Sequence, residues 1–374
     1  MDTVKMLRSG MLAVLLWLAA ALLPILLFSN YHLFQLTMMV VYAIAILGLV
    51  VLTGYNGQIS LGHGAFYAIG AYVTAVLMYQ YDWPYWATLP ASAIVCAAVG
   101  FLIGLPALRL GGLYLALTTF ALAVAIPQLL KHNALEPWTG GVQGLVIDKP
   151  DPPFGLDISP DAWLYLFSLF IGGLLFLFAW NVVRGRVGRA MMAIRDHALA
   201  AEAMGINIAL LKTRTFALSA MFTGIAGSLG AIVVQFVAPD SFGIFVSIYF
   251  FVGLVVGGVS SIGGAIFGGL FIEFVPNLAE TVSKAAPGAV YGVILIAVMF
   301  LMPSGAAGFV AAAFARFRRR TKSGLVAPVT RGEVGAEDVS ATAALPRGAG
   351  PDVGGPQPVR KRTRTSLRHR RLLA

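Results

Sequence analysis

Four neutral polar residues lie within one short glycine-rich stretch of an otherwise strongly apolar chain. The stretch, GYNGQISLGHGAF, runs from Gly54 to Phe66 and includes Asn56, Gln58, Ser60 and His63. Their amide, hydroxyl and imidazole groups donate and accept hydrogen bonds without holding an ion tightly. A helix broken here at membrane depth would have to be surrounded by protein or line a polar path. A plain cytoplasmic turn between two spans, capped by Ser60, is the alternative interpretation.

A second candidate segment is long and polar: RGRVGRAMMAIRDHALAAEAMGINIALLKTRTFALSA, from Arg184 onwards. Four apolar residues recur in it at helical spacing: Ile194, Ala198, Ala201 and Met204. Three charged residues fall on the other sides of that helix: Arg195, Asp196 and Glu202. Gly205 is a typical helix stop, and Asn207 is a typical cap for a second short helix. The pattern predicts a helix–turn–helix that docks a narrow apolar face in a partner's groove, with a solvated connecting loop as the alternative.

Several kinds of enzyme are excluded by the motifs that the chain lacks. No lysine follows a glycine, so the Walker A motif is absent, and there is neither a G-x-S-x-G elbow nor an H-E-x-x-H zinc helix. The five histidines are scattered among different segments, which argues against a metal cluster. The one cysteine, Cys96, cannot form a disulfide within the chain. We therefore predict no catalytic residue, no metal and no cofactor.

The glycine-rich stretch GGVSSIGGAIFGG, from Gly257 to Gly269, has two interpretations. It could be a phosphate-binding loop, but its apolar setting favours glycines that let membrane helices approach closely. Three glycine pairs have the four-residue spacing for such packing: Gly100 and Gly104, Gly253 and Gly257, and Gly264 and Gly268.

Glu273 is the chief charged residue deep in a predicted span. An intramembrane carboxylate suggests a proton or cation relay by default. A single one near a proline is more often a hydrogen-bonding residue between helices, and we favour that interpretation.

The composition predicts an all-α, polytopic helical membrane protein. Apolar residues make up 59% of the chain and charged residues only 11%, whereas globular proteins average about 45–50% and about 25%. Each span needs about 20 apolar residues, and we expect about 8–10 transmembrane helices. The candidate spans are Met11–Phe28 (a retained helix, not a signal peptide), Leu33–Thr53, Ala65–Gln80, Ala87–Leu108, Leu113–Leu130, Trp163–Val183, Thr213–Val237, Ile244–Val259, Ile262–Ala279 and Gly288–Pro303.

The distribution of charge predicts the orientation and the domain division. The segment 184–214 is rich in Lys and Arg and the segment 131–162 in Asp and Glu, so the first should be cytoplasmic and the second outside. Both termini then lie in the cytoplasm. We divide the chain into a transmembrane domain, 1–309, and a basic tail, 310–374, that cannot fold alone. The tail suits anionic membrane lipid, and without aromatic interleaving we expect no nucleic acid partner.

Both polar segments resemble signature stretches of LivM-type permeases, the integral-membrane subunits of ABC importers for branched-chain amino acids. The stretches are YNGQISLGHGAFYAIGAY and GRAMMAIRDHALAAEAMGIN. GGLYLALTTFALA, WTGGVQGL, VAPDSFGIFVSI and VVGGVSSIGGAIFGG fit the same pattern in the same order. The resemblance covers roughly Leu33 to Gly308.

The resemblance implies a transport subunit of the bacterial inner membrane that has no ATPase site of its own. Its partners would be a LivH-type permease, two cytoplasmic ATP-binding subunits and an extracytoplasmic solute-binding protein. The family's cytoplasmic coupling loop would correspond to Arg195, Asp196, Ala201, Glu202, Ala203, Gly205 and Asn207. The translocation path would run beside Asn56, Gln58, Ser60 and His63. The expected substrates are leucine, isoleucine and valine, or related small amino acids and amides.

Other classes of membrane protein fit the residues less well. A secondary transporter driven by an ion gradient would need several buried carboxylates, and Glu273 is the one candidate in the predicted spans. A membrane enzyme would need paired catalytic groups, and an assembly scaffold would not explain a polar break in a helix.

Overall fold

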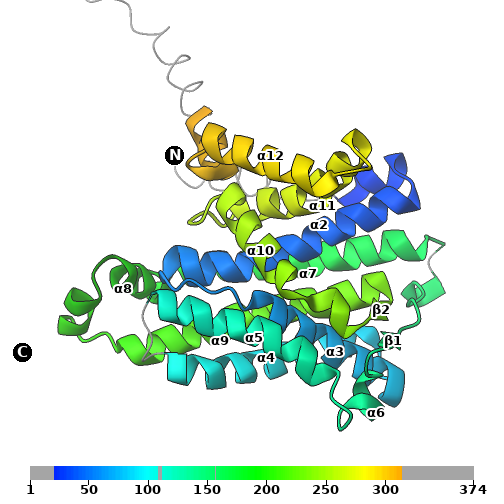
Figure 1. Cartoon of the computed structure of the whole chain (residues 1–374), viewed down its shortest axis with the longest axis horizontal. Helices are drawn as coiled ribbons and strands as arrows, with labels where there is room; N and C mark the ends of the chain where they lie inside the picture. The colour runs from blue at the N-terminus through cyan, green and yellow to red at the C-terminus, as the bar shows by residue number, and fades with distance from the viewer. Residues whose placement is uncertain (1–20, 108–111, 156, 314–374) are drawn as a thin grey trace, which may run out of the picture. The chain divides into compact units, whose positions relative to one another are not determined.

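The computed structural model describes residues 21–107, 112–155 and 157–313, and most of them are helical (Figure 1). The predicted tail lies almost entirely outside the described residues, as does much of the predicted span Met11–Phe28. Of that span, residues 21–27 are described and are helical.

The helices begin and end close to the predicted spans. In chain order they are α2 (Asn30–Leu49), a π-helix (Val50–Tyr55), α3 (His63–Tyr81), α4 (Tyr85–Ala107), α5 (Leu113–Leu130), α6 (Glu136–Thr139), α7 (Pro160–Arg184), α8 (Arg186–Ala203), α9 (Ile208–Val234), α10 (Ile244–Gly257), α11 (Gly264–Val282) and α12 (Pro287–Leu301). Two 3-10 helices, Pro153–Gly155 and Pro239–Phe242, and two strands, β1 (Leu145–Val146) and β2 (Phe236–Val237), complete the elements.

The class of polytopic helical membrane protein is confirmed. Within the described residues, six helices are long and apolar enough to cross a membrane, or seven if the bent pair Pro287–Leu301 and Gly305–Ala313 is one span. The expected number was larger because we counted three further segments. Met11–Phe28 lies mostly outside the described residues, α5 contributes a shorter apolar helix, Tyr114–Leu130, and the helix α3 does not meet the same test.

The long helix α9 is the central element of the described part of the chain. It packs against α2, α3 and α4, and it is buried along most of its length. Small residues make this position possible, because glycine, alanine and serine let neighbouring backbones approach. The helices α10 and α11 pack on the far side of α2, and Figure 1 shows α12 beyond them.

The predicted glycine packing is confirmed between α10 and α11. A Cβ atom added at Gly257 would lie 2.1 Å from the carbonyl oxygen of Gly264, and one at Gly268 would lie 2.3 Å from that of Gly253. Gly100 on α4 likewise faces Ala220 of α9, at 2.6 Å from its Cβ. The sequence did not single out a tighter contact, in which Gly227 of α9 lies against the backbone of Tyr67.

The loops opposite α8 are held together by a short sheet and by ion pairs. β1 and β2 pair antiparallel, with Leu145 opposite Val237, which adds a small β element to the expected all-α fold. Lys149 pairs with Asp161, and Lys131 pairs with Asp240. These contacts join the loops after α5, α6 and α9 at the end of the helices remote from α8 (Figure 1).

The contact between α3 and α9 generates a prediction about stability. The Cβ of Gly227→Ala would lie 2.0 Å from the carbonyl oxygen of Tyr67, so the two helices would have to separate. We expect the free energy of unfolding to fall by about 1–3 kcal/mol. Gly292→Ala on α12 is the matched control, because its added methyl group meets no atom within 4 Å. Thermal unfolding of the detergent-solubilised chain, followed by circular dichroism, measures both, and equal Tm values would contradict the packing argument.

Candidate functional site

The polar stretch Gly54–Phe66 is a break between two helices. The last turn of α2 widens into the π-helix Val50–Tyr55, residues 56–62 are not helical, and α3 begins at His63. Gly57 has a φ of +72°, which favours glycine and ends the helical path. Single π-turns of this kind occur often at functional sites. Gly64 lies inside α3, where its N–H donates to Ser247 Oγ at 2.9 Å.

All four predicted polar side chains of this break are buried within the described residues. The exposed fractions are 2% for Asn56, 7% for Gln58, 1% for Ser60 and 1% for His63. Buried polar groups are costly unless they are hydrogen-bonded, so their partners decide what the segment is. A solvated turn would leave such side chains in water, and the structure therefore favours a break enclosed by helices.

A chain of hydrogen bonds joins the break to α9 and α2. Ser219 Oγ donates to the carbonyl of Gly48 at 2.6 Å, and His63 Nε2 lies 2.7 Å from Ser219 Oγ. Ser60 Oγ lies 3.1 Å from His63 Nδ1 and accepts from the N–H of Gly62 at 3.3 Å. This pattern is satisfied by a neutral imidazole that carries its proton on Nε2 and accepts at Nδ1. Ser60 thus holds the imidazole, whereas the helix cap itself is Gly62.

The break penetrates between the helices instead of lying at their ends. Gln58 Nε2 donates to the carbonyl of Lys212 at 3.1 Å, near the start of α9. Ser219, the partner of His63, lies further along α9, about 16 Å from the first residue of that helix at the rise of an α-helix. The N–H of Leu61 donates to Thr119 Oγ1 of α5 at 3.0 Å. Gln58, Leu61 and His63 therefore each have a hydrogen-bond partner on another helix.

Asn56 differs from the other three polar residues. Neither its amide nitrogen nor its amide oxygen has a hydrogen-bond partner among the described residues. A buried amide without a partner costs about 1–3 kcal/mol. A rearrangement of the break can therefore give this side-chain amide a hydrogen bond that it lacks in the conformation described.

The second predicted segment forms α8 and the start of α9. α8 has a kink at His197, where φ is −150° and ψ is 91°. Gly205 has a φ of +82° and ends the segment, as its position predicts. Asn207 Oδ1 accepts from the N–H of Leu210 at 2.9 Å, so the predicted cap is confirmed. The predicted second short helix is wrong, because the helix that Asn207 caps is the long membrane helix α9.

The apolar face of α8 is divided by the kink. Ile194 and Ala201 are each 3% exposed and pack inward, as predicted. Met204 was expected on the same face but is 85% exposed, and Leu199 is 83% exposed. Beside them is an open groove of about 460 Å³, lined by Glu202, Gly205, Ile206, Asn207, Ile208, Ala209 and Lys212. The structure thus brings Glu202, Gly205 and Asn207 together at one surface, with Ala203 exposed nearby.

Arg195 is the residue through which the two predicted segments meet. Its Nη1 donates to the carbonyl of Gly54 at 2.6 Å, and its Nε donates to Asp196 Oδ1 at 3.0 Å. Ser260, in the loop between α10 and α11, also donates to the carbonyl of Gly54, at 3.4 Å. The sequence patterns do not indicate that the two segments meet, and they do not single out Ser219 or Ser260 as partners. Both are serines within or directly beside an apolar span, and that position is the signal by which they could have been identified.

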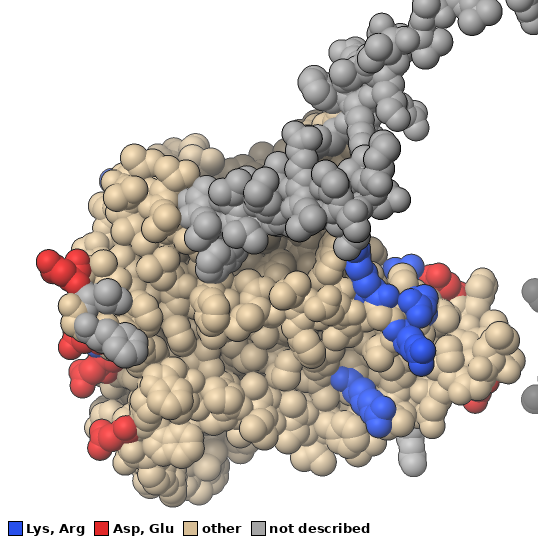
Figure 2. Space-filling view, turned by 180° about the vertical axis from the view of Figure 1, so that it is seen from behind, with Lys and Arg blue, Asp and Glu red and all other residues tan. Residues whose placement is uncertain are grey.

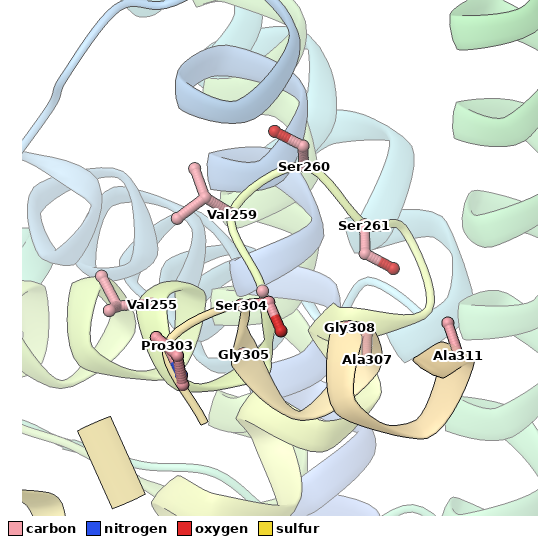
Figure 3. A pocket seen from close by; sticks show the side chains of 11 residues that line it. Val255, Val259, Ser260, Ser261, Pro303, Ser304, Gly305, Ala307, Gly308 and Ala311 are labelled. Atoms are coloured by element: carbon pink, nitrogen blue, oxygen red, sulfur yellow. The ribbon is translucent and has the colours of Figure 1, made fainter. Parts of the chain in front are cut away.

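The glycine-rich loop 258–263 borders a cavity of about 490 Å³ (Figure 3). Figure 3 shows Val259, Ser260 and Ser261 of this loop beside Ser304 and Gly305 of the following bent pair. No lysine or arginine lines the cavity within the described residues. Among these described residues the cavity therefore has no cationic side chain that could bind a phosphate, and helix packing explains these glycines.

Glu273 lies half-buried on α11. Its backbone carbonyl accepts from Asn277 Nδ2 at 2.8 Å. Within the described residues its carboxylate makes no hydrogen bond or ion pair, so the structure does not supply the expected bond between helices.

Charge is distributed unequally along the helices (Figure 2). Lys and Arg side chains gather near the end that carries α8, and most Asp and Glu side chains on this face lie at the other end. The charge asymmetry that the sequence predicts is thus present on the folded surface.

The matches with known proteins cover most of the described helices. The family described as "Branched-chain amino acid transport system / permease component" matches residues 31–303. The chain is 36% identical to the high-affinity branched-chain amino acid transport system permease protein LivM of Salmonella typhimurium over 249 residues, which are 60% of this chain and 58% of that protein. The match therefore spans less than two thirds of its LivM relative.

More distant relatives carry other names. The chain is 27% identical to the permease protein LivH of the same transport system in Escherichia coli K12, over 71% of this chain and 91% of LivH. It is 30% identical to the autoinducer 2 import system permease protein LsrC of Enterobacter sp. strain 638, over 47% of this chain and 50% of LsrC. No solved structure matches.

The family match extends from the first turn of α2 to just beyond α12, and it includes both the buried polar break and α8. This chain belongs to the family of permease components of branched-chain amino acid transport systems.

Proposed function

We propose that the chain is a permease subunit of an ATP-driven importer, which moves branched-chain amino acids or related small amino acids and amides across the bacterial inner membrane. The observation that carries the proposal is the family match over residues 31–303. The matched residues include the polar helix α8, which has apolar side chains exposed on its surface. The names of LivM and LivH supply the class of substrate.

An importer of this kind needs partners that the chain does not contain. We propose a LivH-type permease beside it, two cytoplasmic ATP-binding subunits and an extracytoplasmic solute-binding protein. The chain has similarity to both LivM and LivH, which supports pairing between two related permeases. Substrate choice in such an assembly rests largely with the binding protein.

We propose that α8 and the turn after it receive the ATP-binding subunit. Leu199 and Met204 are large, apolar and more than four-fifths exposed, which is costly unless a partner covers them. The adjoining groove contains the acidic Glu202 and the basic Lys212. An apolar anchor with charged groups around it is the arrangement that helix-in-groove recognition uses.

The translocation path is proposed to pass beside Asn56, Gln58, Ser60 and His63. Their burial means that the path is closed at this point in the conformation described. The segment can open only if the hydrogen bonds to Ser219 and Lys212 exchange for others. Neutral donors and acceptors suit a small zwitterionic or amide solute that must also be released.

The proposed orientation places α8 and both termini in the cytoplasm. The concentration of Lys and Arg near α8 in Figure 2 supports it, because cytoplasmic loops are enriched in these residues.

Replacing Glu202 and Gly205 by alanine should uncouple ATP hydrolysis from transport. Ala at position 205 would have to adopt a φ of +82°, and this costs about 1–2 kcal/mol locally without a steric clash. We expect uptake per ATP hydrolysed to fall by about tenfold, the change expected when a contact of this size is lost. Uptake and ATP hydrolysis are measured on the same proteoliposomes.

The matched control for this variant is Glu280→Ala with Gly288→Ala. It changes one exposed glutamate and one uncrowded glycine, on α11 and α12 and away from α8. Normal coupling in the Glu202/Gly205 variant would show that the ATP-binding subunit contacts another surface.

Ser60→Cys, in a chain whose Cys96 is replaced by Ala, tests the path. Ser60 is 1% exposed, so the thiol should be protected from a hydrophilic maleimide at rest. During turnover we expect the labelling rate to rise at least about tenfold, since minor conformations are typically populated at about 0.1–10%. Ser92→Cys on α4, at 0% exposure, should stay protected throughout. Equal protection of both thiols during turnover would remove residue 60 from the path.

A further inference from the structure

We propose that Arg195 is the positioning residue through which movement of α8 displaces the buried break between Gly54 and His63. The proposal rests on the ATP-driven transport proposed above. It assigns to one guanidinium the link between the surface that receives the ATP-binding subunit and the polar segment beside the path.

The first support is the set of partners that this guanidinium holds. Nη1 lies 2.6 Å from the carbonyl oxygen of Gly54 and 3.5 Å from Ser260 Oγ, and Nε lies 3.0 Å from Asp196 Oδ1. Gly54 and Ser260 are 141 and 65 residues away from it along the chain. One side chain of α8 therefore bonds the end of the α2 π-helix and approaches the loop between α10 and α11.

The second support is the need of the Gly54 carbonyl for a donor. It belongs to the last turn of a helix, where carbonyls lack donors from the same helix. A charged N–H donor makes a shorter and stronger bond to it than a neutral one. Arg195 is 33% exposed, so water screens this contact only in part. Ser260 donates to the same carbonyl at the longer distance of 3.4 Å, so the guanidinium is the main partner.

The third support is the close approach that two glycines permit. A Cβ at Gly57 would lie 2.8 Å from Arg195 Cγ, so only a glycine lets the break rest on the stem of this arginine. A Cβ at Gly54 would lie 2.0 Å from the carbonyl oxygen of Val259. The break is thus held between α8 on one side and the loop 258–263 on the other, and it has to follow if either moves.

The fourth support is the position of Arg195 along α8. It lies two residues before the kink at His197, at the end of the first half of the helix. The half after the kink carries the exposed Leu199, and Met204 follows it. A partner that pulls on those side chains would bend α8 at the kink, next to the bond between Arg195 and Gly54.

The link continues from Gly54 into the helix core. Thr53 Oγ1 donates to the carbonyl of Gln58 at 2.9 Å, and Gln58 bonds the carbonyl of Lys212 on α9. Beyond Gln58, the Ser60–His63–Ser219 chain reaches the carbonyl of Gly48. A shift of Gly54 would therefore also displace His63. In the shifted arrangement the side-chain amide of Asn56, which has no partner among the described residues, could form a hydrogen bond.

Arg195→Ala tests this link, with Arg189→Ala as the matched control. Arg189 is on the same helix, but among the described residues its side chain donates to the carbonyl of Arg184 and makes no bond to the break. We expect Arg195→Ala to assemble with its partners and to hydrolyse ATP, while uptake per ATP falls by about tenfold, as the loss of a bond to a charged donor predicts. Arg189→Ala should keep the ratio of the unaltered protein. Arg195→Lys keeps the positive charge but loses the several N–H donors of the guanidinium, so its uptake per ATP should lie between the two values.

A second readout does not depend on transport. Amide hydrogen exchange of the purified chain should become faster in residues 54–62 of Arg195→Ala and stay unchanged in α4 and α7, because only the break loses its tie. Unchanged exchange in residues 54–62 would overturn the inference. A local loss of packing alone would speed exchange without altering the uptake-to-ATP ratio, and that combination would overturn it too.

The outcomes separate this inference from the proposed function. If the unaltered assembly shows no ATP-dependent uptake, the proposed function fails and the link fails with it. If the unaltered assembly transports and Arg195→Ala transports with the same ratio, the function stands and the link is wrong. Should Arg195→Ala not assemble, Arg195→Lys is judged by the same ratio, and a value equal to that of the unaltered protein overturns the inference.

Discussion

Inside a membrane every backbone polar group must find its partner in the protein, and this constraint organises the region around Gly54. Once α2 ends within the helix core, the chain must satisfy the groups that its irregular backbone exposes. It does so with two hydroxyls and a guanidinium from other helices, those of Thr119, Ser219 and Arg195. The break is therefore stable only while α5, α8 and α9 are in place around it.

The same constraint explains why the break and α8 belong together. The carbonyl of Gly54 needs a donor, and the donor is carried by the helix that is too polar to enter the membrane. Two glycines bring the backbone close enough for this bond. The bond between Arg195 and Gly54 thus joins the polar helix α8 to the end of the apolar helix α2.

Much of the fold could be predicted from the sequence because the signals are local. The bounds of α5 match the predicted span Leu113–Leu130, and Asn207 and Gly205 have the roles that their residue types indicate. The glycine pairs on α10 and α11 also pack as their spacing indicates. Apolar runs, caps and close glycine spacing are properties of a few neighbouring residues, and a single sequence contains them.

Other features depend on contacts between distant residues, which local patterns do not show. The kink at His197, the π-helix that ends at Tyr55 and the exposure of Met204 have no signal in the local sequence. The partners of His63 and Gly54, Ser219 and Arg195, are 156 and 141 residues away along the chain. The polar residues of the candidate site could thus be found from the sequence, whereas the bonds that join them to distant helices could not.

Under the proposed function, this chain transports its solute only as part of an ATP-driven assembly. The most direct measurement is the uptake of labelled leucine into proteoliposomes that contain the chain with its candidate permease and ATP-binding partners. Uptake is compared with and without the binding protein, enclosed ATP and an imposed proton gradient. The account predicts uptake that requires both ATP and the binding protein. Uptake driven by the proton gradient alone would contradict it, and would direct attention to Glu273.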